Sequence, residues 1–145
     1  MERNPLAKGL LLLALALIAL PCAKSQEKKS VAVFMTSDCH DTVGSIATSA
    51  LRERIRGSNG YSLATGSTKG KSGFEILLTC AAIPGHESSA SAVSYVFDAL
   101  LPDGARFFVQ PGVGVVGRDG VDGWAQTIFS QFDDWATSTQ RAMTD

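Results

Sequence analysis

Histidine and cysteine are scarce in this chain of 145 residues, which has only two histidines and three cysteines. No pair of possible ligand residues has the C-x-x-C or helical spacing that is typical of zinc sites. The sequence therefore predicts no metal and no cofactor. The alternative is a metal site built from Cys39, His40, Asp41 and His86. The simpler interpretation is that both histidines lie in exposed loops and bind no metal.

A concentrated run of basic residues is also missing. The chain has 13 lysines and arginines against 14 acidic residues, and its net charge is −1. Proteins that bind nucleic acid normally show a clustered basic face. We therefore expect no nucleic-acid partner.

Long apolar runs are absent except near the N-terminus, where the run from residue 9 to residue 20 contains 12 residues. A membrane-spanning helix needs about 20 residues, so this run is too short to be one. Arg3 and Lys8 precede the run, and Ala23 and Ser25 follow it with the small-residue pattern of a cleavage site. The segment 1–25 is therefore predicted to be a secretory signal peptide.

The remaining segment 26–145 has a length that fits a single domain with no transmembrane segment. We expect it to be exported, and either periplasmic or secreted. Cys22 provides an alternative, in which the mature protein is lipid-anchored through this cysteine. Pro21 occupies the position where a lipoprotein signal has a small residue, so the cleaved form is the main prediction.

Two cysteines, Cys39 and Cys80, remain after the signal segment. In a small exported domain an even pair favours a disulfide over two free thiols. A bridge that closes a loop of this size stabilises a fold by roughly 4 kcal/mol in the chain-entropy model. We therefore predict a Cys39–Cys80 disulfide.

The clearest amphipathic helix lies between about residues 42 and 56. Its apolar residues recur at a spacing of three and four and form one stripe: Val43, Ile46, Ala47, Ala50, Leu51 and Ile55. Asp41 or Ser37 can cap its start. Three arginines lie near its end, Arg52, Arg54 and Arg56, and the simpler interpretation is that they are solvated charges that complement the helix dipole. The alternative is a possible anion or partner contact at these residues.

The other elements are predicted from alternation and periodicity. Short apolar runs indicate strands at 31–36, 61–65, 74–83 and from 106 towards 116, and apolar and aromatic residues indicate a helix from about 121 to 135. Segment 90–101 fits both a helix and a strand; its β-branched and aromatic residues favour a strand. This order predicts an α+β fold, a two-layer sandwich with a mixed four- or five-stranded sheet and two helices on one face.

Two motifs resemble catalytic or cofactor sites. Cys39, His40 and Asp41 are the residue types of a thiol-enzyme triad, but neighbours in an extended chain point to opposite sides, so a nucleophile at Cys39 would need the distant His86 as its base. The spacing of Gly112, Gly114 and Gly117 matches G-x-G-x-x-G. No second strand follows to complete a dinucleotide site, so these glycines are interpreted as part of a bent strand or turn.

One part of the chain resembles a known group of proteins. The carrying residues are the start at Asp41-Thr42-Val43-Gly44, the helix end at Leu51-Arg52-Glu53 and the return at Gly60-Tyr61-Ser62-Leu63. This layout is similar to small exported α/β proteins of the bacterial envelope, such as TolB N-terminal-like accessory domains. The resemblance implies a periplasmic setting and a binding or accessory role, and it transfers no site residues. The two cysteines and the long aromatic C-terminal helix depart from it.

The sequence thus favours an exported, non-enzymatic binding or envelope accessory protein, whose partner is an unknown protein or cell-envelope component. The support is the absence of any convincing catalytic pattern. The alternative is a small secreted hydrolase, thiol- or metal-dependent, that uses Cys39 and His86. No catalytic residue is predicted under the first interpretation.

Overall fold

A computed structural model describes residues 30–144, apart from the side chain of Phe108. The predicted signal segment 1–25 and Cys22 lie outside these residues. The elements in chain order are β1 (Val31–Asp38), α2 (Thr42–Arg56), β2 (Tyr61–Ala64), β3 (Gly73–Ala82), β4 (Ala90–Leu100), β5 (Arg106–Gly117), a short 3-10 turn (Arg118–Gly120) and α3 (Val121–Thr144). No helix in this part of the chain is both long and apolar enough to cross a membrane.

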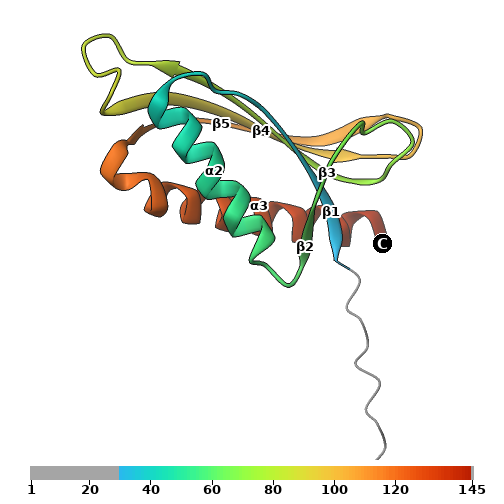
Figure 1. Cartoon of the computed structure of the whole chain (residues 1–145). Helices are drawn as coiled ribbons and strands as arrows, with labels where there is room; N and C mark the ends of the chain where they lie inside the picture. Colours follow the sequence, from blue (N-terminus) through green and yellow to red (C-terminus); the bar gives the residue numbers. More distant parts are fainter. Residues whose placement is uncertain (1–29, 145) are drawn as a thin grey trace, which may run out of the picture.

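The five strands form one mixed sheet in the order β2-β1-β3-β4-β5. β1 is parallel to both of its neighbours, whereas β3, β4 and β5 are joined by antiparallel pairing. Both helices lie on the same face of the sheet, so the domain has two layers (Figure 1). The predicted α+β sandwich is confirmed, as is the strand at 90–101.

The core lies between the sheet and the two helices because alternate strand residues point to this inner face. Phe74, Ile76 and Leu78 of β3 face the helices and are buried. The ring of Phe132 on α3 lies at the centre, with its centroid 5.8 Å from that of Phe74 and 5.4 Å from that of Phe97. The aromatic residues of the last helix therefore serve the core, as their periodicity predicts.

Tyr61, at the start of β2, connects the edge of the sheet to α3. Its hydroxyl donates a hydrogen bond to Oδ1 of Asp133 at 2.7 Å. Burial, together with this bond to a carboxylate, raises the pKa of Tyr61 well above its usual range. The neutral hydroxyl therefore fastens the short strand β2 to the helix layer at physiological pH.

The G-x-G-x-x-G pattern lies within β5 itself rather than in a strand-to-helix loop. Gly112 pairs with Tyr95 of β4, and a Cβ added at Gly112 would lie 2.1 Å from Cζ of the Tyr95 ring. The Tyr95 hydroxyl donates a hydrogen bond to Oε1 of Gln131 on α3 at 2.7 Å. Gly112 thus makes room for a ring that joins the sheet to α3, which is a packing role.

Changing Gly112 to Ala should destabilise the fold, because the methyl group would displace the Tyr95 ring and break its bond to Gln131. We expect a loss of about 1–3 kcal/mol of unfolding free energy, the range for overpacking. Denaturant unfolding measures it. Gly114→Ala is a matched control on the same strand and face, because its added Cβ meets nothing within 4 Å. Equal losses in the two variants would contradict the role assigned to Gly112.

Candidate functional site

The run Cys39, His40 and Asp41 connects β1 to α2, and its three side chains have separate tasks. Cys39 forms a disulfide with Cys80 of β3, with the Cα atoms 4.5 Å apart. The exposed His40 pairs with Asp38, its Nε2 lying 2.8 Å from Oδ1. Asp41 caps α2 by accepting a bond from the Gly44 amide at 2.8 Å. The predicted disulfide and cap are confirmed, and the three residues do not form a triad.

The disulfide also sets how closely α2 approaches the sheet. A Cβ added at Gly44 would lie 2.6 Å from Cβ of Cys80 and 2.8 Å from its sulfur, so the first turn of α2 packs directly on the bridge. The second carboxylate oxygen of Asp41 accepts a hydrogen bond from Ser91 of β4 at 3.0 Å. The N-terminus of α2 is therefore held by β3 and β4 together.

His86, the other residue of the hydrolase hypothesis, is exposed in the loop between β3 and β4. The sulfur of Cys39 is already bonded to Cys80, and a sulfur in a disulfide is not available as a thiolate nucleophile. Among residues 30–144, no group of three His, Cys, Asp or Glu side chains lies close enough together to hold a metal ion. The geometry therefore gives the Cys39–His86 hypothesis no support.

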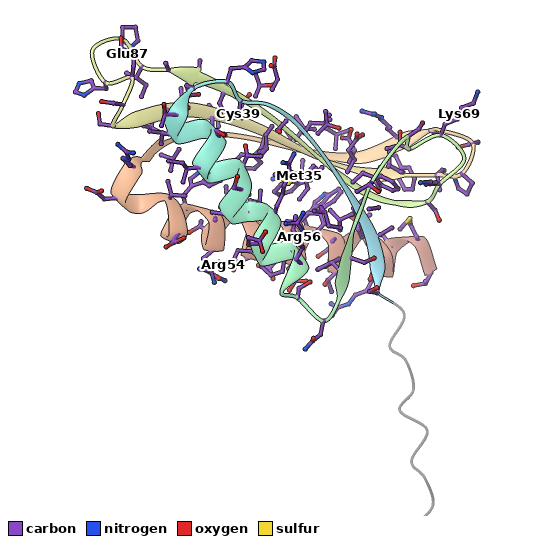
Figure 2. The ribbon with its side chains drawn as sticks, in the orientation of Figure 1. Met35, Cys39, Arg54, Arg56, Lys69 and Glu87 are labelled. Carbon is purple, nitrogen blue, oxygen red and sulfur yellow. A yellow bond between two sulfur atoms is a disulfide. The ribbon has the colours of Figure 1, made fainter. Side chains whose placement is uncertain are left out.

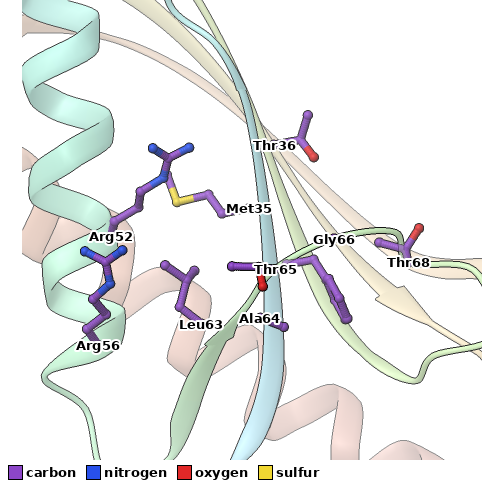
Figure 3. A pocket seen from close by; sticks show the side chains of 10 residues that line it. Met35, Thr36, Arg52, Arg56, Leu63, Ala64, Thr65, Gly66 and Thr68 are labelled. Atoms are coloured by element: carbon purple, nitrogen blue, oxygen red, sulfur yellow. The ribbon is translucent and has the colours of Figure 1, made fainter.

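A cleft of about 340 Å³ opens beside α2, where β2 ends and β1 continues (Figure 3). Its walls include Arg52 and Arg56 from α2, Met35 and Thr36 from β1, and Leu63 from β2, and the chain leaving β2 completes it. Figure 3 shows the Arg52 side chain extending from α2 toward Met35 of β1, with the Arg56 side chain running along the helix toward Arg52. We call this hollow the arginine cleft.

Only two of the three predicted arginines reach this cleft. Residues four apart in a helix share a face, whereas residues two apart lie on nearly opposite faces. Arg52 and Arg56 accordingly line the cleft, while Arg54 is exposed on a different side of α2 (Figure 2). Of the three residues predicted as one contact, the cleft therefore contains Arg52 and Arg56 only. Their spacing of four residues indicates in the sequence that they share a face of the helix.

The two arginines of the cleft differ in their partners. Arg56 forms an ion pair with Glu53 one turn earlier in the helix. Arg52 donates a hydrogen bond of 3.3 Å to the hydroxyl oxygen of Ser37 on β1, and among the described residues it has no carboxylate partner. The cleft therefore carries one positive charge that the visible part of the protein leaves uncompensated.

No protein-family model matches this chain, and no curated protein is significantly similar to it. A functional assignment therefore depends on the geometry and charge of the sites in the structure.

Two other clefts have comparable size but lack basic walls. One, of about 430 Å³, lies near the start of β1 and the end of α3, and its lining includes Leu100, Gln140 and Met143. The other, of about 360 Å³, lies between β4, β5 and α3, with Asp134 as its one charged lining residue. The arginine cleft is thus distinguished by its charge rather than by its volume.

A buried acidic pair on the outer face of the sheet is not evident from the sequence pattern. Glu75 of β3 and Asp98 of β4 are direct cross-strand partners, and only 3% and 4% of these residues is exposed. Arg106 lies between them, with Nη2 2.7 Å from Glu75 Oε2 and Nη1 3.2 Å from Asp98 Oδ2. The sequence could have indicated this pair, because Glu75 and Asp98 are each a charged residue within an otherwise apolar strand. Because both acids face one arginine, the cluster joins three strands and is not a free acid–base pair.

Replacing both Cys39 and Cys80 with serine should lower the unfolding free energy by about 4 kcal/mol, because the unfolded chain regains the entropy of an open loop. Urea unfolding without reductant measures the difference. Adding a reductant should weaken the parent protein to a similar extent and leave the double variant unchanged. A variant with only Cys22 changed to serine should show no free thiol when it is titrated without reductant. Two free thiols would contradict the bridge and restore the thiol-enzyme hypothesis.

Changing Arg106 to Gln should destabilise the fold by about 3 kcal/mol, because it leaves two buried carboxylates facing each other without a cation. Denaturant unfolding at neutral pH tests this. Asp98→Asn added to the Arg106→Gln variant should recover part of the loss by removing the repulsion. Arg118→Gln, at an exposed arginine just beyond β5, is the control and should change stability by less than about 0.5 kcal/mol. No recovery in the double variant would show that charge repulsion is not the cause.

Proposed function

We propose that this protein is an exported, non-enzymatic binding domain that holds an anionic group of a protein or envelope partner in the arginine cleft. The observation that carries the proposal is the pair of guanidinium groups beside the end of β2, where β1 continues, with Arg52 free of any carboxylate among the described residues. Guanidinium groups bind carboxylates and phosphates through charge-assisted hydrogen bonds.

The position of the cleft supports a binding role. Ligands of open sheets with parallel strands tend to bind beyond the carboxyl ends of the strands, where neighbouring connections diverge. Here the cleft lies at the carboxyl end of β2 and alongside β1, between α2, which the chain leaving β1 enters, and the chain that leaves β2 toward β3. Its volume of about 340 Å³ is at the lower end of the range of roughly 300–1,000 Å³ for ligand sites.

Export is supported by two separate features. The segment 1–25 has the sequence pattern of a signal peptide, and the bridge between Cys39 and Cys80 is of the kind that persists in oxidising compartments. An accessory role in the bacterial envelope, which the TolB-like layout implies, is part of the same proposal. A hydrolase centred on Cys39 would require the bridge to be reduced first.

The binding role predicts that Arg52→Gln and Arg56→Gln weaken anion binding while Arg54→Gln does not. The measurement is a titration of the labelled protein with sodium acetate and with inorganic phosphate, followed by the NMR signals of the arginine side chains. In the parent, the Arg52 and Arg56 signals should shift with the added anion. In each cleft variant the remaining shift should require roughly tenfold or more anion, because one charge-assisted hydrogen bond is lost.

Arg54→Gln is a matched control because it removes the same charge from the same helix outside the cleft. Sodium chloride at equal ionic strength controls for screening. An equal loss in all three variants would show a diffuse effect of helix charge, and the proposed site would be wrong.

A further inference from the structure

β1 has a free edge inside the arginine cleft. β2 contains only four residues and its pairing with β1 ends at Phe34 and Ala64, whereas β1 continues to Asp38. On its other side β1 stays paired with β3 up to Asp38 and Thr79. The strip from Met35 to Asp38 is therefore a strand of the sheet with a neighbour on one side and, among the described residues, no partner strand on the other.

Alternate residues of this strip point their backbone hydrogen-bonding groups to the open side, and the others point to β3. The amide of Val31 donates to the carbonyl of Gly60, which directly precedes β2, at 2.9 Å. Because the direction of backbone groups alternates along a strand, Val33, Met35 and Ser37 face the same side as Val31. Ser37 lies beyond the last residue of β1 that pairs with β2. No described residue bonds to its amide or carbonyl on this side, so both groups are available to an incoming chain.

The two sides of the strip differ in chemistry. Arg52 stands on the helix side, where it bonds to the Ser37 hydroxyl, and Arg56 lies one turn further along α2. On the other side, Thr65 and Thr68 belong to the loop that leaves β2 and leads to β3. An extended chain lying along β1 would therefore present alternate side chains to the arginines.

We infer that the arginine cleft receives an extended acidic segment of a partner protein, which adds a strand to the free edge of β1 at Met35–Asp38 and places a Glu or Asp side chain against Arg52. The inference rests on the proposed anion-binding function and names its ligand class. Addition of a strand to a sheet edge is a recurring mode of peptide recognition, in which backbone bonds supply affinity and side-chain pockets supply specificity.

Charge complementarity selects an acidic segment over a neutral or basic one. Arg52 has no carboxylate partner among the described residues, and a guest carboxylate would supply it. The free strand edge selects a peptide over a small anion, because a peptide backbone offers both a carbonyl for the Ser37 amide and an N–H group for the Ser37 carbonyl at the spacing of a strand, whereas acetate can only accept from the amide. A peptide with a carboxylate side chain and a free backbone edge would contact both Arg52 and β1, whereas a small anion would contact the arginines on the helix side only.

The test uses the full chain, labelled for NMR, and a short capped peptide that alternates valine and glutamate and is long enough to span Met35–Asp38. Its first comparison is the same peptide with alternate backbone nitrogens methylated, which keeps the carboxylates and removes the edge-pairing donors. Its second comparison replaces glutamate with glutamine. Backbone amide exchange at Ser37 is recorded with and without peptide, and Val33, which already lies in the β1–β2 ladder, serves as the internal reference.

We expect the parent peptide to slow exchange at Ser37 and leave Val33 unchanged, and to bind about tenfold or more tightly than either the methylated or the glutamine peptide. Arg52→Gln should remove the preference for glutamate over glutamine, and Arg54→Gln should keep it. If the methylated peptide binds as well as the parent, or if exchange at Ser37 does not change, strand addition is wrong and the anion-binding function stands. If neither the peptides nor acetate or phosphate bind, both proposals fail.

Discussion

The order of the strands is the constraint on which the remaining architecture depends. β1 lies between β2 and β3, so the chain that leaves β2 must cross β1 to reach β3. The crossing segment uses glycines with positive φ at Gly66, Gly70 and Gly73, values that residues with a side chain rarely adopt. On the way, the amine of Lys71 lies 5.4 Å from the centre of the Phe34 ring on β1. Because β2 ends early to begin this crossing, no described strand pairs with the β1 edge beyond Phe34, and the arginine cleft occupies that place.

The disulfide supports β1 in this position between β2 and β3. It joins the end of β1 to β3, the neighbour on the side opposite the cleft, and the first turn of α2 packs on it at Gly44. β1 can therefore keep its course beyond β2 without a second neighbouring strand. The sulfur of Cys39 is bonded to Cys80, His40 pairs with Asp38 and Asp41 caps α2, so the three neighbouring side chains have separate partners.

Much of the fold follows from local patterns in the sequence. Apolar residues repeat every three to four positions in α2 and α3. This periodicity predicts both helices correctly because each helix packs on the sheet through one apolar stripe. The sequence of β4 fits both a helical and a strand periodicity. Tyr95 and Phe97 lie two residues apart and their rings stack with centroids 5.1 Å apart, which places them on one face of a strand. Ile46 is an exception, since it belongs to the apolar pattern of α2 yet is 40% exposed.

The sites were harder to predict because they depend on contacts between distant segments. Spacing alone can place Arg52 and Arg56 on one face of α2, but whether that face meets a free strand edge depends on the length of β2 and the order of the sheet. Glu75 and Asp98 become neighbours only through the register of β3 and β4, and neither strand by itself indicates that Arg106 lies between them. Local propensity carries no information about either fact.

The two arginine sites illustrate how burial separates structure from recognition. Arg106 has two carboxylates, each almost fully buried, so its charge is consumed within the fold. Within residues 30–144, Arg52 bonds only to the Ser37 hydroxyl, and its cleft lies beside backbone of β1 that no strand of this part of the chain pairs with. Exposed charges are screened over about 8 Å at physiological salt, which makes a guanidinium group alone a weak and unselective contact. A strand edge adds hydrogen bonds of fixed direction that screening affects less, and its combination with Arg52 gives the cleft a means of distinguishing an acidic chain from a free anion.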